Sequence, residues 1–288
     1  MSVESLAYID RLERKYQVGI DQNDLPAFWR DVGRYAPLYE FTPGQQVTWV
    51  SSVYFENKEF DLLRLGFLSI HGGIHVRLRT YEYECHPSRP ILNYWLEMKT
   101  RKDQARKKRR LKMQREALAA FLEGKDIGGR ILEDDLDSAD PEMARRFYQE
   151  IRETILKLDL KPTLLVTYKR VAFQNETERL SIDWDMRFYH IGLHIHRYPS
   201  LKDIATTLGE KVDTVVLELK YPQGAFPAWV ENLKRSYPIW ERRYYSKFKD
   251  GMHCLFPQIF KRYAESNCFL QMIRAHTENW GVPLERYG

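Results

Sequence analysis

Charged and apolar side chains alternate along several segments of this chain that have the composition of β-strands. In residues 75–81, Arg77 and Arg79 occupy odd positions, whereas Val76 and Leu78 occupy even positions. Because successive side chains of a strand point to opposite faces, such a segment gathers its charges on one face. Two further segments pair charges in the same way, with Glu97 and Lys99 in residues 93–99 and with Glu218 and Lys220 in residues 215–220.

This alternation has two structural interpretations. A single alternating strand usually belongs to an open sheet whose polar face is solvated. Several strands that carry Arg, Lys and Glu on the same parity instead favour a charged surface that curves around a polyanion. If such a sheet closes, its charged parity lines a lumen and its apolar parity packs against helices. The interior charges then need a ligand or water to solvate them.

The composition indicates a folded, globular protein. Hydrophobic residues make up 43% of the 288 residues and aromatic residues 14%, which is sufficient for a substantial core. The sequence contains no evident linker or internal repeat, so we expect residues 1–288 to form one domain. The formal net charge of +5 is compatible with nucleic acid, phosphorylated small molecules or a membrane surface as a partner, and does not choose among them.

The sequence also favours a cytoplasmic protein without a membrane span. No stretch approaches the roughly 18 consecutive apolar residues that a spanning helix needs. The charged N-terminal segment lacks the apolar core of a secretory signal. Cys85, Cys254 and Cys268 are far apart and odd in number, so they form neither a metal-binding motif nor a disulfide framework.

Hydrophobic periodicity predicts a mainly antiparallel sheet with flanking helices, which is an α+β architecture. The predicted strands cover residues 9–18, 47–55, 75–81, 92–99, 163–173, 179–188 and 212–221. The predicted helices cover residues 24–35, 56–67 (a short helix or turn), 103–122, 141–158, 226–235, 240–249 and 257–263. The helix at 103–122 is expected to be strongly basic, because residues 106–110 are five consecutive cations.

The ordered set of charged motifs resembles the VTC-domain branch of the triphosphate tunnel metalloenzymes, a family of polyphosphate polymerases. The matching motifs run along most of the chain. They are Glu13-Arg14-Lys15-Tyr16, Val53-Tyr54-Phe55-Glu56-Asn57, Arg77-Leu78-Arg79-Thr80-Tyr81, Leu96-Glu97-Met98-Lys99-Thr100, the basic segment up to Lys112, Pro162, Tyr168-Lys169-Arg170-Val171-Ala172-Phe173, Arg179-Leu180-Ser181-Ile182-Asp183, Leu217-Glu218-Leu219-Lys220-Tyr221 and Tyr245-Ser246-Lys247-Phe248.

The resemblance implies an antiparallel tunnel barrel of about eight strands with a charged interior. It also implies binding of ATP, polyphosphate or triphosphate together with Mn²⁺ or Mg²⁺. Glu218 corresponds to the metal-binding carboxylate, and Glu97 and Glu13 are weaker metal candidates. The implied phosphate-binding residues are Lys15, Arg77, Arg79, Lys99, Lys112, Arg170, Arg179, Lys220 and Lys247, among which Arg77, Arg79, Lys99, Arg170 and Lys247 are the implied catalytic residues.

These residue types suit phosphoryl transfer, which depends mainly on positioning and on neutralising charge. We therefore expect a polyphosphate polymerase that transfers the γ-phosphoryl group of ATP to a growing chain. A triphosphatase of the same fold is the first alternative. A non-catalytic module that binds polyphosphate or nucleic acid through the basic segment at residues 107–112 is the second, and nucleic acid is the less favoured ligand. Coupling to a membrane would require a separate partner.

Two smaller groups of residues have competing interpretations. His190, His194 and His196 have a spacing that can bind zinc, and His194 and His196 would share one face of a strand. No cysteine accompanies them, and we interpret them as surface or packing residues. Tyr16 and Tyr168 are considered as contacts for a nucleobase at a tunnel mouth. The C-terminal aromatic residues are interpreted as helix packing rather than base stacking: Trp229, Trp240, Tyr244, Tyr245 and Phe248.

Overall fold

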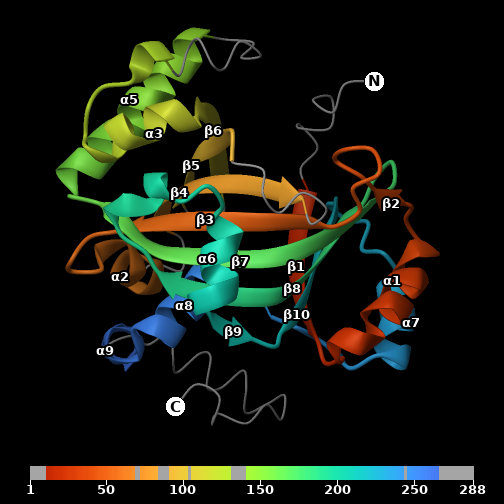
Figure 1. Cartoon of the computed structure of the whole chain (residues 1–288). Helices are drawn as coiled ribbons and strands as arrows, with labels where there is room; N and C mark the ends of the chain where they lie inside the picture. The colour runs from red at the N-terminus through yellow and green to blue at the C-terminus, as the bar shows by residue number, and fades with distance from the viewer. Residues whose placement is uncertain are drawn as a thin grey trace.

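A strongly curved antiparallel sheet dominates the computed structural model of the chain (Figure 1). The model describes residues 11–68, 72–83, 91–102, 105–130, 141–242 and 245–265. The sheet consists of β1 (Arg11–Val18), β2 (Leu38–Tyr39), β3 (Thr48–Glu56), β4 (Gly72–Tyr83), β5 (Asn93–Lys102), β6 (Ala105–Gln114), β7 (Lys161–Gln174), β8 (Arg179–His190), β9 (Glu210–Val212), β10 (Val215–Pro222) and β11 (Ile239–Glu241).

The 11-stranded sheet follows the order β11-β1-β10-β8-β7-β3-β4-β5-β6, with β2 beside β7 and β9 beside β8. Within the described residues, the edge strands β6 and β11 do not pair with each other, so hydrogen bonds do not close the sheet into a barrel. The expected α+β class, with an antiparallel sheet and flanking helices, is confirmed. The sheet differs from the expectation in having more than about eight strands and open edges.

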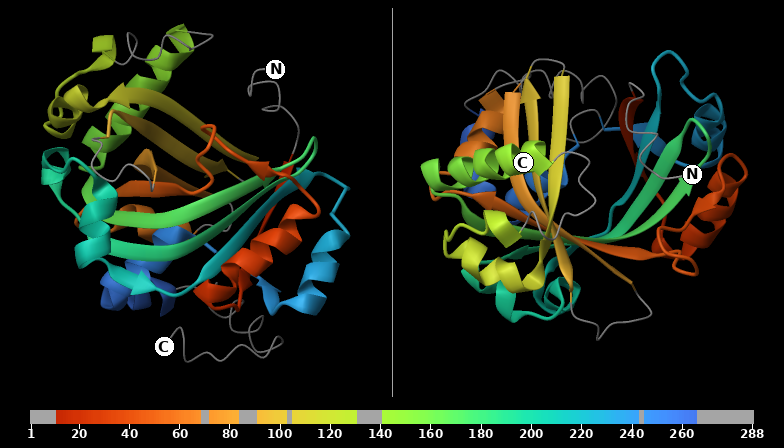
Figure 2. Two further views of the ribbon diagram at one scale, coloured as in Figure 1. Left: turned by 45° about the vertical axis from the view of Figure 1, so that its right-hand side comes forward. Right: turned by 90° about the horizontal axis from the view of Figure 1, so that it is seen from above.

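Helices lie on both faces of this sheet (Figure 2). They are α1 (Leu25–Gly33), α2 (Asp61–Leu68), α3 (Arg115–Leu122), α5 (Pro141–Lys157), α6 (Leu201–Leu208), α7 (Trp229–Ser236), α8 (Lys247–Leu255) and α9 (Pro257–Glu265), with short 3₁₀ turns at Gln22–Asp24 and Leu193–Arg197. None of the helices in the described part of the chain combines the length and the hydrophobicity needed to cross a bilayer.

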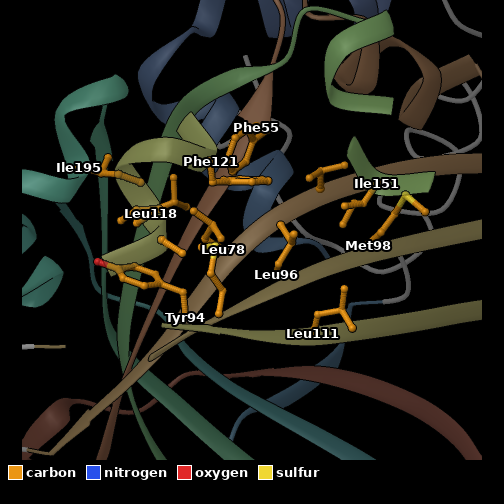
Figure 3. Packing of buried hydrophobic residues seen from close by; sticks show 14 of the residues in the cluster. Phe55, Leu78, Tyr94, Leu96, Met98, Leu111, Leu118, Phe121, Ile151 and Ile195 are labelled. Carbon is orange, nitrogen blue, oxygen red and sulfur yellow. The ribbon is translucent and has the colours of Figure 1, made fainter. Parts of the chain in front are cut away.

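The apolar parity of β4, β5 and β6 packs against α3 and α5. Figure 3 shows Leu78, Leu96 and Leu111 from these three strands directed toward Leu118 and Phe121 of the helix α3. All five side chains are buried, and burial of each contributes roughly 1.5–3 kcal/mol. Because neighbouring positions point to opposite faces, this packing forces Arg77, Glu97 and their same-parity neighbours onto the other face of the sheet.

The other half of the sheet repeats this arrangement with α1 and α7. Val171, Ile182 and Leu217 lie on the apolar parity of β7, β8 and β10, and they pack with Phe28 of α1 and Leu233 of α7. Helices therefore cover the outward face at both ends of the strand order, and the charged parity is left on the inward, concave face.

One end of the concave face is covered by α8. Phe248 and Met252 of this helix are buried with Tyr168 and Val166 of β7. The helix approaches the sheet so closely that a Cβ atom added to Gly251 would lie 2.8 Å from side-chain atoms of both Leu164 and Phe188. The absence of a side chain at Gly251 thus permits the packing that closes this end.

The basic helix predicted for residues 103–122 is wrong. Residues 105–114 form the strand β6, which pairs with β5, and a helix begins only at Arg115. Pairing places Leu111 and Met113 in the core while Lys112 points to the opposite face, so the tertiary context overrides the helical appearance of the basic run.

Two predictions of secondary structure in the second half of the chain are also wrong. The helix predicted for residues 240–249 is replaced by β11 and by α8, which begins only at Lys247. His194 and His196 lie in a 3₁₀ turn rather than on a strand face. Cys254 is a free, exposed thiol, whereas Cys85, Cys268 and Tyr244 lie outside the described residues. That residues 1–288 form one domain stays a prediction.

The close contact at Gly251 generates a stability prediction. Replacing Gly251 with Val should destabilise the fold by about 3 kcal/mol, because the new side chain overlaps buried atoms of Leu164 and Phe188. Equilibrium denaturation with urea would measure the loss. Gly192→Val is the control, since no atom lies within 4 Å of the Cβ that it would introduce. Equal unfolding midpoints for the two variants would contradict the packing argument.

Candidate functional site

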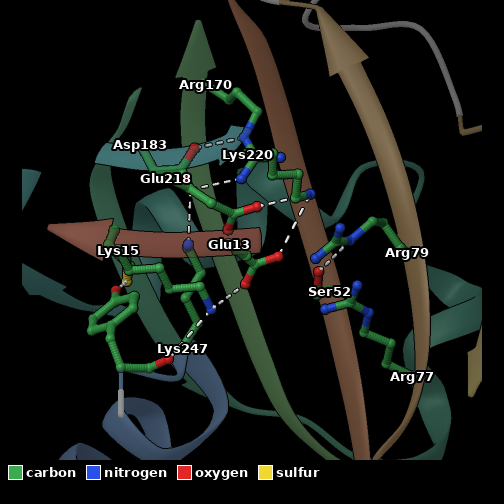
Figure 4. Close-up of polar contacts among 12 residues, drawn as sticks. Glu13, Lys15, Ser52, Arg77, Arg79, Arg170, Asp183, Glu218, Lys220 and Lys247 are labelled. Atoms are coloured by element: carbon green, nitrogen blue, oxygen red, sulfur yellow. Dashed lines mark hydrogen bonds and ion pairs between the residues drawn. The ribbon is translucent and has the colours of Figure 1, made fainter. Parts of the chain in front are cut away.

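The charged parity of separate strands forms one continuous surface, here called the charged face. Cross-strand register places Lys15 opposite Glu218, and Glu13 opposite Lys220. Residues that are directly opposite in a sheet share a face. The same register rule adds Arg77 and Arg79 of β4, Arg170 of β7 and Asp183 of β8. Figure 4 shows these side chains together with Lys247 of the helix α8, which the register does not place.

Glu218 and Glu13 form an acidic pair where β1 and β10 contribute to the charged face. Lys220 Nζ lies 3.0 Å from Glu218 and 3.7 Å from Glu13, and Lys15 Nζ lies 3.3 Å from Glu13. Burial alone raises the pKa of Glu218, but Lys220, Lys15 and other nearby cations outweigh it and hold that pKa well below the ordinary value. Burial and Glu218 raise the pKa of Glu13, but Lys15, Lys220 and Lys99 outweigh them and lower it, so both carboxylates are ionised at neutral pH.

Asp183 joins two of the predicted phosphate-binding residues. Its carboxylate accepts hydrogen bonds from Arg170 Nε at 2.6 Å and Arg170 Nη2 at 2.7 Å, and Lys247 Nζ lies 2.8 Å away. The Asp183 side chain is 0% exposed. Burial raises its pKa, but Arg170 and Lys247 outweigh this effect and lower it. This buried anion fixes both cations, one from β7 and one from α8, beside each other.

A second buried carboxylate orients Arg77. Glu97 Oε2 accepts from Arg77 Nε at 2.7 Å, and Lys108 Nζ lies 2.8 Å from Glu97 Oε1. Arg77 also donates to the hydroxyl of Tyr54 at 3.0 Å. Burial of Glu97 raises its pKa, but Arg77, Arg79 and Lys108 together pull it far below the ordinary value. Glu97 is thus engaged by two cations at once.

Arg79 and Lys99 lie on either side of Arg77 along the charged face. Arg79 is buried and donates from Nε to Ser52 Oγ at 3.0 Å. Burial lowers the pKa of Lys99 to about 8, with further lowering by Lys15 and Arg77 against the opposing effect of Glu13. A part of the Lys99 population can therefore lose its charge at mildly alkaline pH.

The remaining predicted phosphate-binding residues lie at the end of the charged face away from α8. Lys112 is opposite Trp95, which is in turn opposite Arg79. Arg179 is opposite Lys220, and burial together with the nearby Arg170 lowers its pKa. All of the predicted phosphate-binding and metal-binding residues therefore share one face.

Sequence reasoning did not identify Asp183, Lys108, Ser52 or Tyr54 as site residues. The sequence predicts a helix at Lys108, and the face on which Lys108 lies is evident only from the pairing of β6 with β5. Asp183 has the same parity as Arg179 on β8, which is a signal that could have found it. In contrast, Tyr16 and Tyr168 are buried, so neither offers an open ring to a nucleobase. Tyr168 instead lies beneath Lys247, whose Nζ is 4.6 Å from the ring centroid.

Comparisons with known proteins show the family to which the chain belongs. A curated relative, vacuolar transporter chaperone complex subunit 4 of Trypanosoma brucei brucei, is 25% identical over 231 residues, which cover 72% of this chain and 28% of that protein. The chain therefore spans little more than a quarter of the relative's length.

Similar solved structures include two proteins from Pyrococcus horikoshii OT3. PH1819 is 13% identical with a TM-score of 0.36, and PH1012 is 12% identical with a TM-score of 0.31. Each comparison covers 78% of this chain and 87% of the other. Likeness at this level has no bearing on function. The model of one family, described as the VTC domain, matches residues 10–256. Because this match covers most of the sequence, the chain belongs to the VTC domain family.

Proposed function

We propose that the protein is a metal-dependent polyphosphate polymerase that transfers the γ-phosphoryl group of ATP to a phosphate chain bound on the charged face. The observation that carries the proposal is the convergence of Arg and Lys side chains from different strands on one concave surface. Membership of the VTC domain family supports it. The relative's membership of a chaperone complex supports the further proposal of a separate partner, including a membrane partner, for a protein that acts in the cytoplasm.

The cations of the charged face suit a chain of phosphates. Arg77, Arg79 and Arg170 each present a planar guanidinium that can donate two hydrogen bonds to phosphate oxygens. Lys99 and Lys247 add point charges near the end that α8 covers. Because phosphoryl transfer spreads charge over the equatorial oxygens, fixed cations that are already in place lower the barrier without reorganising.

The acidic pair fits a divalent cation. Glu218 raises the pKa of Glu13, and both carboxylates contact Lys220, so they form adjacent hard oxygen donors of the kind that Mg²⁺ and Mn²⁺ prefer. No group of three or more His, Cys, Asp or Glu side chains that could hold a metal occurs within the described residues. Phosphate oxygens and water would therefore complete the shell. Glu97 suits this role less, because Arg77 and Lys108 already engage it.

The proposed reaction needs little acid–base chemistry from the protein. A terminal oxygen of the acceptor chain attacks the γ-phosphorus of ATP, the bond from that phosphorus to the β,γ-bridging oxygen breaks, and ADP leaves. The attacking oxygen is already ionised, so no general base is required. A divalent cation, when bound, would neutralise part of the phosphate charge. Hydrolysis would need a positioned carboxylate to activate water, and the two outcomes differ only in the acceptor.

The proposed function generates an activity prediction. Purified protein incubated with ATP and Mn²⁺ should produce long phosphate chains, seen on polyacrylamide gels. Glu218→Gln and Arg77→Ala should lower the rate at least tenfold, because each removes a charge that faces the reacting phosphates. Arg14→Ala is the control: Arg14 lies between Glu13 and Lys15 on β1 but on the opposite face.

The other possible results of this assay distinguish the alternative functions, provided that circular dichroism shows that each variant is folded. Release of orthophosphate alone would replace the polymerase by a triphosphatase. Tight binding of polyphosphate without turnover would indicate a binding module, and preference for DNA at matched salt would indicate a nucleic-acid ligand. Equal loss of activity in Arg14→Ala would argue against the charged face as the reaction site.

A pH prediction follows from Lys99. Its pKa of about 8 means that its charge is present below pH 8 and is lost as the pH rises toward 9. The affinity for tripolyphosphate should therefore fall over this range, by at most tenfold per pH unit for one proton. Lys99→Arg should flatten the profile, since Arg stays charged. Calorimetric titration of the wild type and of Lys99→Arg measures the affinity at each pH. Ionisation of tripolyphosphate affects both proteins equally, so it does not contribute to the difference between their profiles. Identical slopes would exclude Lys99 as the titrating group.

A further inference from the structure

The two ends of the charged face differ in chemistry. At one end, Phe248 and Met252 of α8 are buried against the sheet, and Lys247 completes the cation set. The other end is lined by aromatic rings from β2, from the segment that follows it and from the end of β4. Two of these rings are substantially exposed: Phe41 by 44% and Tyr81 by 36%. The exposed ring of Tyr81 thus lies two residues along β4 from the phosphate-binding residue Arg79.

Backbone pairing and one hydrogen bond hold the aromatic rings at this end. Tyr39 pairs with Ala172 of β7, which places β2 along the sheet edge of the charged face. The hydroxyl groups of Thr42 and Tyr83 lie 2.5 Å apart, so the segment after β2 is joined to β4. Phe41 lies between these two attachments.

Arg179 links the rings to the charged face. Its guanidinium carbon lies 5.1 Å from the ring centroid of Phe41 and 5.8 Å from that of Tyr39. The two rings meet edge to face, with centroids 5.0 Å apart. Tyr81 is close enough to Arg179 and Arg79 for its hydroxyl to raise the pKa of each guanidinium. A flat ligand at this end would meet the exposed rings of Phe41 and Tyr81 and the guanidinium of Arg179.

The register of β4 sets the distance between this end and the phosphate-binding residues. Arg77, Arg79 and Tyr81 are successive residues of the same parity, so each step is about 6.7 Å. A ligand whose phosphates contact Arg77 and Arg79 therefore extends toward Tyr81 when it leaves the charged face. The opposite direction leads to His75, which contacts Phe248 of α8 with ring centroids 4.9 Å apart.

We propose that Phe41 and Tyr81, together with Tyr39 and Arg179, form a subsite for the base of a nucleoside triphosphate. The inference rests on the proposed function, because it places the phosphates of that nucleotide on the charged face. Stacking on an aromatic ring or a guanidinium accepts any base, since every base has a π-face. The subsite therefore distinguishes a nucleotide from linear tripolyphosphate rather than one base from another. It also directs the leaving nucleoside diphosphate toward the end that α8 does not cover.

Binding measurements with two ligands test this subsite. The affinities of ATP and of tripolyphosphate, each with Mg²⁺, are measured by calorimetry for wild type, Phe41→Ala and Tyr81→Ala. Each variant should bind ATP about tenfold more weakly and tripolyphosphate unchanged, because only ATP carries a base to stack. Tyr81→Phe keeps the ring and should retain ATP affinity. Leu38→Ala is the control, since Leu38 is a similarly exposed residue of β2 that has the opposite parity.

The two ligands separate failure of the subsite from failure of the proposed function. Unchanged ATP affinity in both alanine variants overturns the subsite, as does equal weakening of ATP and tripolyphosphate. Absence of binding of either ligand to the wild type overturns the proposed function and the subsite with it. If thermal unfolding shows that Tyr81→Ala is not folded, the test rests on Phe41→Ala alone, again by comparing its affinities for ATP and tripolyphosphate.

Discussion

Strand parity is the constraint on which the rest of the structure depends. Burial of Leu78, Leu96 and their neighbours against helices fixes which side of each strand faces outward. A one-residue slip would exchange every apolar side chain with a charged one, so the register that builds the core also builds the charged face. Hydrophobic burial, roughly 1.5–3 kcal/mol for each side chain, thereby holds like charges together against their mutual repulsion.

Buried carboxylates reduce the electrostatic repulsion among the clustered cations of the charged face in the absence of ligand. Asp183 neutralises part of the charge of Arg170 and Lys247, and Glu97 does so for Arg77. Removing one partner of such a pair leaves an uncompensated charge, which costs more than the pair itself contributes. A phosphate ligand must therefore share these cations with carboxylates that are already bound to them. The net affinity is a difference between two strong interactions, so small changes in carboxylate position alter it substantially.

Alternating parity predicts the fold class, most strands and the shared face of site residues on those strands, such as Arg77, Arg79 and Glu97. It failed where a basic run obscured the alternation: the consecutive cations before Leu111 resemble a solvated helix, and only pairing with β5 makes them a strand. Asp183 and Lys108 escaped prediction for a related reason. The parity of Asp183 can be read from the sequence, but its contact with Lys247 depends on a helix that follows much later in the chain. The role of Lys108 depends on the pairing of β6 with β5, which local periodicity does not encode. Gly251 likewise has no local signal.

The helix α8 connects stability and site geometry. It carries Lys247, whose partner Asp183 lies on β8, and a few residues later it carries Gly251, which permits close contact with Leu164. A change in that packing moves Lys247 relative to the charged face, so effects on folding and on phosphate binding are coupled along this helix. The exposed rings of Phe41 and Tyr81 lie at the opposite end and contribute little to the core. Ligand recognition can therefore be separated from stability at that end.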